Sequence, residues 1–211
     1  MIRNVVFDLG RVIYTYQPRE DLLQLGYDDE FADHFMERVY DNPLWLEGDR
    51  GTYTIHELVE KLCSDFPDMT EDFKRVLDDE WHKRVIKIMQ DSLEFFYDVK
   101  RRGFAIYILS NFPEPFFSQC RARDAFFDEA DGIVVSAHEK LIKPDPDIFK
   151  CLLNRYDLEP KETIFIDDVA KNTDAARALG LWAIQFTDIE ECKQQFEEIL
   201  KKSAQVQPGG F

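Results

Sequence analysis

Polar residues with catalytic potential follow three apolar segments of the sequence. Asp8 follows the first segment, Ser110 and Asn111 follow the second, and Asp167 and Asp168 follow the third. Each of these residues alone could be an ordinary helix cap, because Asp and Ser often follow a strand and begin the next helix. If the three segments are parallel strands of one sheet, however, their carboxyl ends lie at one edge. The sequence therefore predicts a site that combines several carboxylates with a hydroxyl group.

Lys143 adds a positive charge to this predicted site. It lies between the second and third groups and precedes Pro144, in a loop before an expected helix. A single Lys is usually a solvated surface residue, but a Lys at the same sheet edge as several carboxylates is better explained as an ionic clamp or a phosphate ligand. Clustered carboxylates also favour Mg²⁺, which binds carboxylates, water and phosphate oxygens. We therefore expect a site for Mg²⁺ and phosphate.

Five short apolar segments predict the sheet that positions these residues. They are rich in β-branched and aromatic residues and lack the alternation of a half-exposed strand, which is typical of buried parallel strands. Helical patterns separate the last four. This alternation predicts an α/β fold with a doubly wound, Rossmann-like parallel sheet of about five strands. The expected strands are Asn4–Phe7, Phe104–Leu109, Gly132–Val135, Thr163–Ile166 and Trp182–Phe186, and two of the expected helices are Asp91–Arg102 and Asp145–Tyr156.

The interval between the first two strands is too long for one crossover connection. It contains helix-compatible patterns at Asp29–Tyr40, Thr54–Asp65 and Thr70–Val85. We therefore expect a helical cap domain, residues 16–87, inserted into a catalytic core that consists of residues 1–15 and 88–202. A unit inserted after the first strand would lie over the carboxyl ends of the strands, where ligands bind in open α/β sheets. Residues 203–211, with their Pro and Gly, predict a disordered tail.

Composition limits the classes of function. The 211 residues, of which 45% are hydrophobic, suffice for one core plus a modest inserted unit. The formal net charge of -16 opposes binding to nucleic acid or an acidic membrane, and it means that a phosphate site needs local cations. There is no apolar run of membrane-spanning length, and the start of the chain suggests no signal peptide. The four cysteines share no CxxC spacing, so we expect free thiols and a cytoplasmic protein.

Four motifs in this order resemble those of the haloacid dehalogenase superfamily of hydrolases. The motifs are Asp8-Leu9-Gly10-Arg11-Val12, Ser110-Asn111, Lys143-Pro144 and Asp167-Asp168, and the resemblance covers about residues 1–200. It implies a Mg²⁺-dependent phosphatase that acts on a small phosphorylated metabolite, with sugar phosphates among the candidates. The helical insertion resembles the C1 cap of that superfamily.

The resemblance also implies roles for individual residues. Asp8 would be the nucleophile that forms an aspartyl phosphate, a covalent strategy open to carboxylates. Ser110 and Asn111 would bind the transferring phosphoryl group, while Lys143 would offset the charge of the nucleophile and of the phosphoryl oxygens. Phosphoryl transfer requires mainly positioning and charge stabilisation, so these residues and a Mg²⁺ form a sufficient set.

The metal ligands implied by the resemblance are the carboxylates of Asp8 and Asp168 and the backbone carbonyl of Gly10. Asp167 would act through water or behind these ligands, and Asn172 would steady the loop. Gly10 departs from the usual pattern, in which an Asp two residues after the nucleophile is also the general acid. The absence of this Asp implies that water, a cap residue or no group protonates the leaving oxygen. Esters with acidic leaving groups, such as anomeric sugar 1-phosphates, would then be favoured.

Three alternatives fit the sequence less well. A dehalogenase would resemble an Asp-x-Tyr pattern that Gly10 cannot supply, and a phosphomutase is disfavoured because it needs the missing acid and base. A catalytically weak, phosphate-binding regulatory module is less consistent with the presence of Asp8, Lys143 and both late acids. The sequence carries no signal for an oligomeric state.

Overall fold

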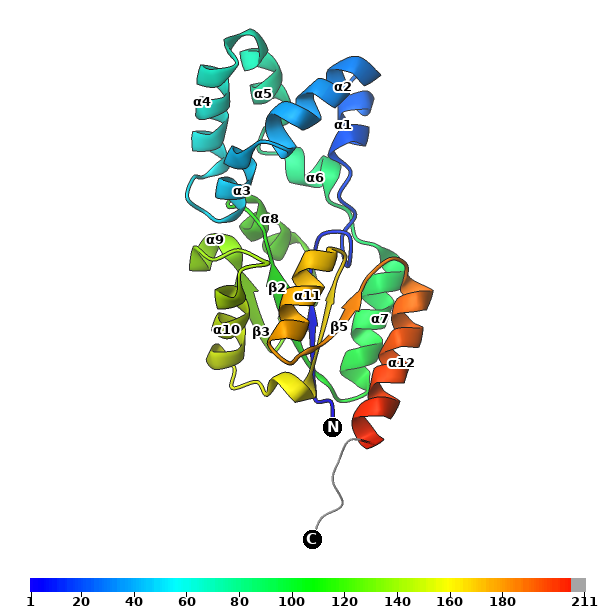
Figure 1. Cartoon of the computed structure of the whole chain (residues 1–211). Coiled ribbons are helices and arrows are strands. Elements are labelled where there is room, and N and C mark those ends of the chain that lie inside the picture. Colours follow the sequence, from blue (N-terminus) through cyan, green and yellow to red (C-terminus); the bar gives the residue numbers. More distant parts are fainter. Residues whose placement is uncertain (206–211) are drawn as a thin grey trace.

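A parallel sheet forms the base of the molecule, with a separate group of helices above its carboxyl edge (Figure 1). The structure is a computed structural model that describes residues 1–205. The strand order is β3-β2-β1-β4-β5, and every pairing is parallel. The α/β, doubly wound fold is thus confirmed. The strands are β1 Asn4–Phe7, β2 Ala105–Ser110, β3 Gly132–Val135, β4 Thr163–Asp167 and β5 Trp182–Gln185.

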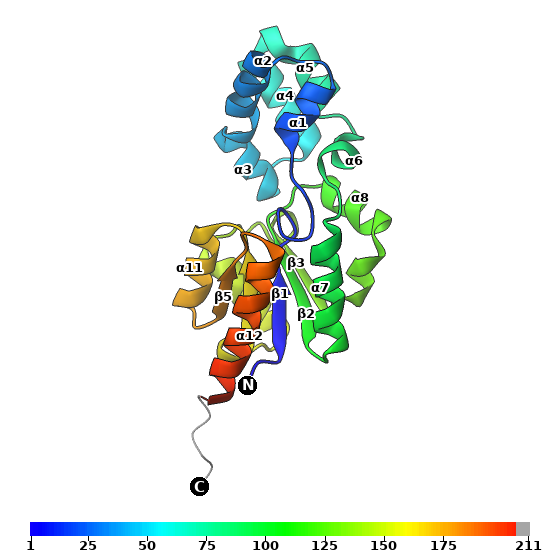
Figure 2. The same ribbon diagram turned by 90° about the vertical axis from the view of Figure 1, so that its right-hand side faces the viewer.

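Helices cover both faces of the sheet (Figure 2). Val5 and Phe7 belong to the hydrophobic cluster that includes residues of α7 and α12, whereas Val6 and Phe165 belong to the cluster that includes residues of α10 and α11. Because successive side chains of a strand point to opposite faces, a sheet covered on both sides needs uninterrupted apolar strands. The helices of this layer are α7 Gln90–Arg101, α8 Phe116–Arg123, α9 Ser136–Glu139, α10 Pro146–Arg155, α11 Ala170–Ala178 and α12 Ile189–Gln205, with 3-10 turns η3 Ala125–Glu129 and η4 Pro160–Glu162.

The group of helices above the sheet is the inserted segment. Local signals mark the starts of two of its helices: the Thr54 side chain and Glu57 form a reciprocal capping box at the start of α4, and Asn42 caps α3. Trp81 stacks on Phe116 of α8 at 4.6 Å between ring centroids, so the insertion also packs on the core. Its elements are α1 Pro18–Gln24, α2 Asp29–Phe35, the π-helix η1 Met36–Tyr40, α3 Pro43–Asp49, α4 Ile55–Asp65, η2 Pro67–Met69, α5 Thr70–Val76 and α6 Trp81–Val85.

The two segments that connect the insertion to the core run side by side. The backbone N–H of Thr15 donates to the carbonyl of Lys87 at 2.7 Å, and that of Met89 donates to Ile13 at 2.8 Å. An isolated antiparallel bridge joins Tyr14 to Ile88 between these bonds. The insertion therefore leaves and rejoins the core at nearly the same point.

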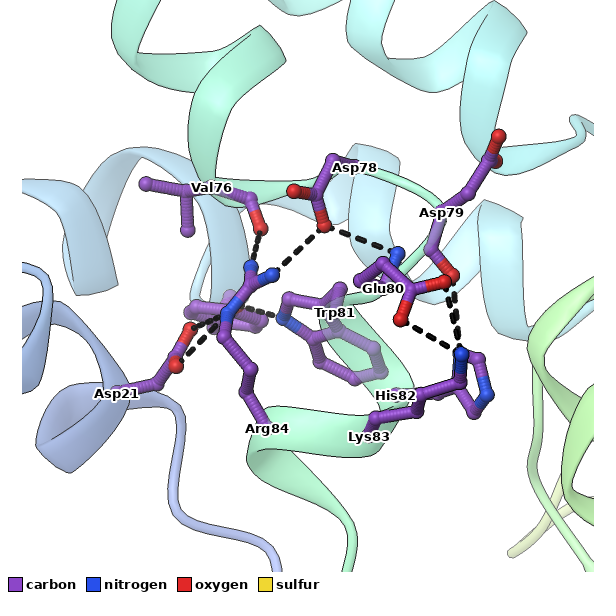
Figure 3. A network of polar contacts seen from close by, with 10 residues as sticks. Asp21, Val76, Asp78, Asp79, Glu80, Trp81, His82, Lys83 and Arg84 are labelled. Atoms are coloured by element: carbon purple, nitrogen blue, oxygen red, sulfur yellow. Dashed lines mark hydrogen bonds and ion pairs between the residues drawn. The ribbon is translucent and has the colours of Figure 1, made fainter.

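The helix predicted over Thr70–Val85 was wrong as one continuous element, because it is divided into α5 and α6. Arg84 explains the break (Figure 3). Its guanidinium donates to the carbonyl of Val76 at 2.6 Å and to Asp78 at 2.8 Å, and it forms two further hydrogen bonds with the buried Asp21. These bonds satisfy groups at the end of α5 and stabilise the turn that follows.

The predicted tail also begins too early. Helix α12 continues to Gln205, since Ile199 and Ser203 on its inner face are buried. The remainder of that prediction, residues 206–211, lies outside the described residues. None of the helices within residues 1–205 combines the length and hydrophobicity that a membrane-spanning segment requires.

Candidate active site

Three strands deliver polar residues to the same edge of the sheet. Asp8 follows the central strand β1, Ser110 ends β2, and Asp167 ends β4. The pairing register places Phe7 opposite both Ile108 and Ile166, so the next residues emerge together. One carboxylate oxygen from each of Asp8, Asp167 and Asp168 lies within 4.8 Å of the others.

Lys143 lies between two of these carboxylates. Its Nζ is 2.9 Å from Oδ1 of Asp8 and 2.6 Å from Oδ2 of Asp167, and it donates a third bond to the carbonyl of Leu109 at 3.0 Å. The Lys143 side chain is 1% exposed and that of Asp167 is 0% exposed. A cation so deeply buried is tolerated only when charges and hydrogen bonds compensate its desolvation. Lys143 is therefore part of the site and not a surface residue.

Asn111 holds the backbone of Lys143. Its side-chain amide donates to the Lys143 carbonyl at 3.0 Å, and its side-chain oxygen accepts from the Lys143 N–H at 2.9 Å. This reciprocal pair fixes the loop after α9 against the end of β2. The Asn111 side chain thus positions Lys143, a contact that spacing in the sequence could not reveal. Its contact with a phosphoryl group stays a prediction.

The carboxylate of Asp167 is occupied by protein donors. It accepts from Lys143, from the Asn172 side-chain amide at 2.9 and 3.1 Å, and from the N–H of Val169 at 2.8 Å. Asn172 therefore does contact the acidic loop. Asp168, by contrast, keeps a 19% exposed side chain, with Nη1 of Arg11 4.0 Å away. Asp8 and Asp168 are consequently better placed than Asp167 to bind a ligand directly.

Burial and charge change the protonation behaviour of this cluster. Burial, and to a smaller extent the charge of Asp167, raise the pKa of Asp8 from 3.8 to about 7, although Lys143 opposes this shift. Burial lowers the pKa of Lys143, but the carboxylates of Asp8 and Asp167 outweigh it and raise that pKa above its usual value. Lys143 is thus a cation at neutral pH, whereas Asp8 is only partly ionised there, so further positive charge would stabilise its carboxylate form.

Ser110 completes the cluster with a hydroxyl group. Its buried Oγ lies close enough to Asp8 to lower the pKa of that carboxyl, yet it has no well-formed hydrogen bond to any group of residues 1–205. A buried polar atom without a partner costs free energy unless a ligand satisfies it. This hydroxyl and the excess of carboxylates over cations fit a phosphoryl group together with a divalent metal ion.

Comparison with known proteins identifies the family. A family model of haloacid dehalogenase-like hydrolases matches residues 2–180. The chain belongs to this family. Sesquiterpene phosphatase astK from Aspergillus oryzae is 27% identical over 190 residues, which cover 88% of this chain and 90% of that protein. D-ribitol-5-phosphate phosphatase from Bacteroides thetaiotaomicron is 25% identical over 213 residues, which cover 95% and 99% of the two chains.

A solved structure shares the fold of this hydrolase. It is a haloacid dehalogenase (HAD) family enzyme from Bacteroides thetaiotaomicron in complex with magnesium and inorganic phosphate. The TM-score is 0.70 and the sequence identity is 23%, and the match covers 89% of this chain and 95% of that one. The family model makes the chain a haloacid dehalogenase-like hydrolase, and two of its relatives are phosphatases.

A pocket of about 340 Å³ lies between the inserted helices and the carboxyl edge of the sheet. The core contributes Asp8, Gly10, Asn111 and Asp168 to its wall. The cap contributes mainly aromatic side chains and two acids, none of which the sequence singled out as catalytic, since spacing alone does not show which side of an inserted helix faces the core. The cap residues and the nearby linker residues that line the pocket are Tyr16, Met36, Tyr40, Asp41, Trp45, Asp49, Trp81 and Ile86.

Proposed function

We propose that this protein is a Mg²⁺-dependent phosphatase that hydrolyses a small phosphorylated metabolite through an aspartyl-phosphate intermediate on Asp8. The observation that carries the proposal is the buried Lys143, which contacts both Asp8 and Asp167 beside the unsatisfied hydroxyl of Ser110. A purely structural ion pair would not need a third carboxylate and an unpartnered hydroxyl at the same sheet edge. The phosphatase relatives support the same reaction class.

The chain's own residues account for the positioning that phosphoryl transfer requires. An oxygen of Asp8 attacks phosphorus, and the bond from phosphorus to the ester oxygen breaks. The Ser110 hydroxyl donates a hydrogen bond to a phosphoryl oxygen, and the ammonium of Lys143 neutralises charge on Asp8 and on the phosphoryl group. Asp167, held by Asn172, keeps Lys143 in place. Water then attacks the aspartyl phosphate and releases inorganic phosphate.

Asp8, Asp168 and the backbone carbonyl of Gly10 would hold the Mg²⁺. The three oxygens are of the chemical type that this cation prefers, and Asp167 supports them from behind through its bonds to protein donors. When bound, the metal supplies charge stabilisation at the transferring phosphoryl oxygens.

The pocket lining supports a substrate with a compact apolar or ring-shaped body. The Trp81 N–H donates to the Tyr40 hydroxyl at 2.9 Å, so the polar atom of Trp81 is already bonded within the cap. Apart from Asp41 and Asp49, the cap side of the pocket is lined by aromatic and apolar side chains. Such a wall can contact the hydrocarbon part of a prenyl phosphate or the face of a sugar ring, so both classes belong in a substrate panel.

Replacement of Asp8 by Asn tests the proposal. The amide is neither a nucleophile nor an anionic ligand, so Mg²⁺-dependent release of phosphate from p-nitrophenyl phosphate should disappear while thermal unfolding still shows a folded protein. Beryllium fluoride should bind the wild type only with Mg²⁺ and should not bind the variant. Undiminished turnover by Asp8→Asn would refute the mechanism, whereas trapping without any turnover on a broad panel would indicate a phosphate-binding regulatory module.

A further inference from the structure

Gly10 leaves the core side of the pocket without a proton donor for the leaving group. Apart from its two neighbours in the chain, no described residue places a heavy atom within 4 Å of a Cβ at Gly10, so there is space for a side chain. Four carboxylates of the described chain line the pocket: Asp8, Asp41, Asp49 and Asp168. Asp8 is the proposed nucleophile and Asp168 a proposed metal ligand. A carboxyl group of this pocket that protonates the leaving oxygen would therefore come from the cap.

Asp49 is the better placed of the two cap acids. It is half-buried at the end of α3, whereas Asp41 is exposed. The Asp49 residue also lines the same pocket as Asp8, the proposed nucleophile. The hydroxyls of Tyr16 and Tyr40 are poor substitutes, because burial raises the pKa of each above its already high ordinary value.

The core fixes the backbone around Asp49. The hydroxyl of Ser136 donates to the Asp49 carbonyl and accepts from the N–H of Phe112, two residues after Ser110. Ser136 thus links the phosphoryl-binding loop directly to the end of α3. A second bond runs from Nζ of Lys140 to the carbonyl of Gly51.

Gly51 lets the cap approach the core closely at this point. It has a φ of +76°, and a Cβ there would lie 2.7 Å from the Cα of Ala137 and closer still to the Ala137 carbonyl oxygen. Only Gly accepts both this backbone conformation and this contact. The position of Asp49 is therefore determined by contacts with the core and not by the cap alone.

We propose that Asp49 is the general acid and base of this hydrolase, supplied by the cap in place of a side chain at position 10. The inference rests on the proposed phosphatase function and deepens it. It identifies a further catalytic residue, and it removes the requirement for an acidic leaving group that Gly10 alone suggested.

The proton transfers balance over one turnover. As the bond between phosphorus and the ester oxygen breaks, the Asp49 carboxyl gives its proton to that oxygen and the product leaves as an alcohol. The Asp49 carboxylate then takes a proton from water while the water oxygen attacks the phosphorus of the aspartyl phosphate. The bond to Asp8 breaks, Asp8 departs as a carboxylate, and Asp49 is protonated again.

The protonation behaviour of Asp49 agrees with this role. Burial, followed by the negative charge of Asp8, raises its pKa from 3.8 to about 7, and Lys143 opposes the shift. An acid with a pKa near the working pH can both donate and accept a proton.

A comparison of leaving groups in the full-length protein with Mg²⁺ tests the proposal. The kcat/KM of wild type, Asp49→Asn and Asp41→Asn is measured on p-nitrophenyl phosphate, whose leaving group needs no proton, and on alkyl phosphates that the wild type hydrolyses. In Asp49→Asn, kcat/KM should fall by about 10²- to 10⁴-fold on alkyl phosphates and by less than about threefold on p-nitrophenyl phosphate. Asp41→Asn, which removes a charge from the same pocket wall, should keep the wild-type ratio between the two ester classes.

Restoration of the acid provides the second measurement. Gly10→Asp in the Asp49→Asn background should recover at least tenfold on alkyl esters, because it places a carboxyl in the open space on the core side. If kcat/KM of Asp49→Asn falls equally on both ester classes and Gly10→Asp does not restore it, the role of Asp49 is overturned and the phosphatase function stays intact. A wild-type protein that hydrolyses no ester would overturn the phosphatase function and, with it, this inference.

Discussion

The affinity for Mg²⁺ should fall steeply as the pH drops below neutrality. Asp8 has a pKa of about 7 in the metal-free protein because it is buried, whereas its ordinary value is 3.8. The folded protein therefore holds a proton on Asp8 between these values and loses it as the pH rises through about 7. Mg²⁺ binds the carboxylate form, so below that pH binding must displace one proton.

The size of the effect follows from this shift. One displaced proton weakens binding tenfold per pH unit below the pKa, so the Kd at about pH 5.5 should exceed that at about pH 8 by roughly 30-fold, or about 2 kcal/mol. Burial also raises the pKa of Asp168, which can only steepen the dependence. Thermal unfolding at a series of Mg²⁺ concentrations gives the Kd at each pH, because a ligand at 100 times its Kd stabilises a protein by about 2.7 kcal/mol.

Asp8→Asn is the control for this experiment. It removes the titrating group, so any remaining Mg²⁺ stabilisation should be much weaker and should depend less on pH. A monovalent salt at matched ionic strength reports the general effect of added cations on a protein with a formal net charge of -16. A wild-type Kd that is the same at both ends of the pH range would refute the assignment of Asp8 as a buried, proton-binding metal ligand.

Three further predictions concern the ion pairs of Lys143, the contact between cap and core at Gly51, and the cap itself. Lys143→Met should lower turnover more than tenfold and destabilise the fold by about 3–5 kcal/mol, because it leaves two buried carboxylates without a cation. Lys150→Met, which removes an exposed lysine, should change neither quantity. Activity assays and urea unfolding measure the two effects. Gly51→Ala should impair alkyl phosphate hydrolysis, whereas Gly103→Ala, at another positive φ but with open space around its Cβ, should cost only stability. Replacement of residues 16–87 by a short linker should retain hydrolysis of p-nitrophenyl phosphate and abolish that of alkyl esters; equal retention of both would show that the cap neither selects substrates nor donates a proton.

The core of the candidate site could be predicted because parallel strands share an edge. Asp8, Ser110 and Asp167 each end or follow an apolar strand, so their approach was a consequence of sheet geometry and not of detailed packing. The fold class followed from the same alternation of strands and helices. The contacts of Asn111 were not predictable in this way, since they depend on the path of the loop that carries Lys143.

The cap was less predictable for two physical reasons. Its helices are short, so one tertiary contact outweighs local propensity: Arg84 divides the helix expected over Thr70–Val85. The catalytic face of the cap is also set by its docking on the core. Asp49 looks in the sequence like any surface acid at the end of a helix, and only the bonds from Ser136 and Lys140 to its backbone region place it at the pocket.

The paired linkers would allow the cap to be exchanged for another insert. Because Thr15 and Lys87 already meet through a backbone hydrogen bond, an insert of another length or sequence could begin and end there without any change to the sheet. Recombination could thus alter substrate preference in one event while the phosphoryl-transfer residues are inherited intact. If Asp49 donates the proton, such an exchange would succeed only when the new insert carries its own acid or when position 10 gains one. Gly10 and the cap acid would then form a compensating pair, and lineages that lose one should be under selection to acquire the other.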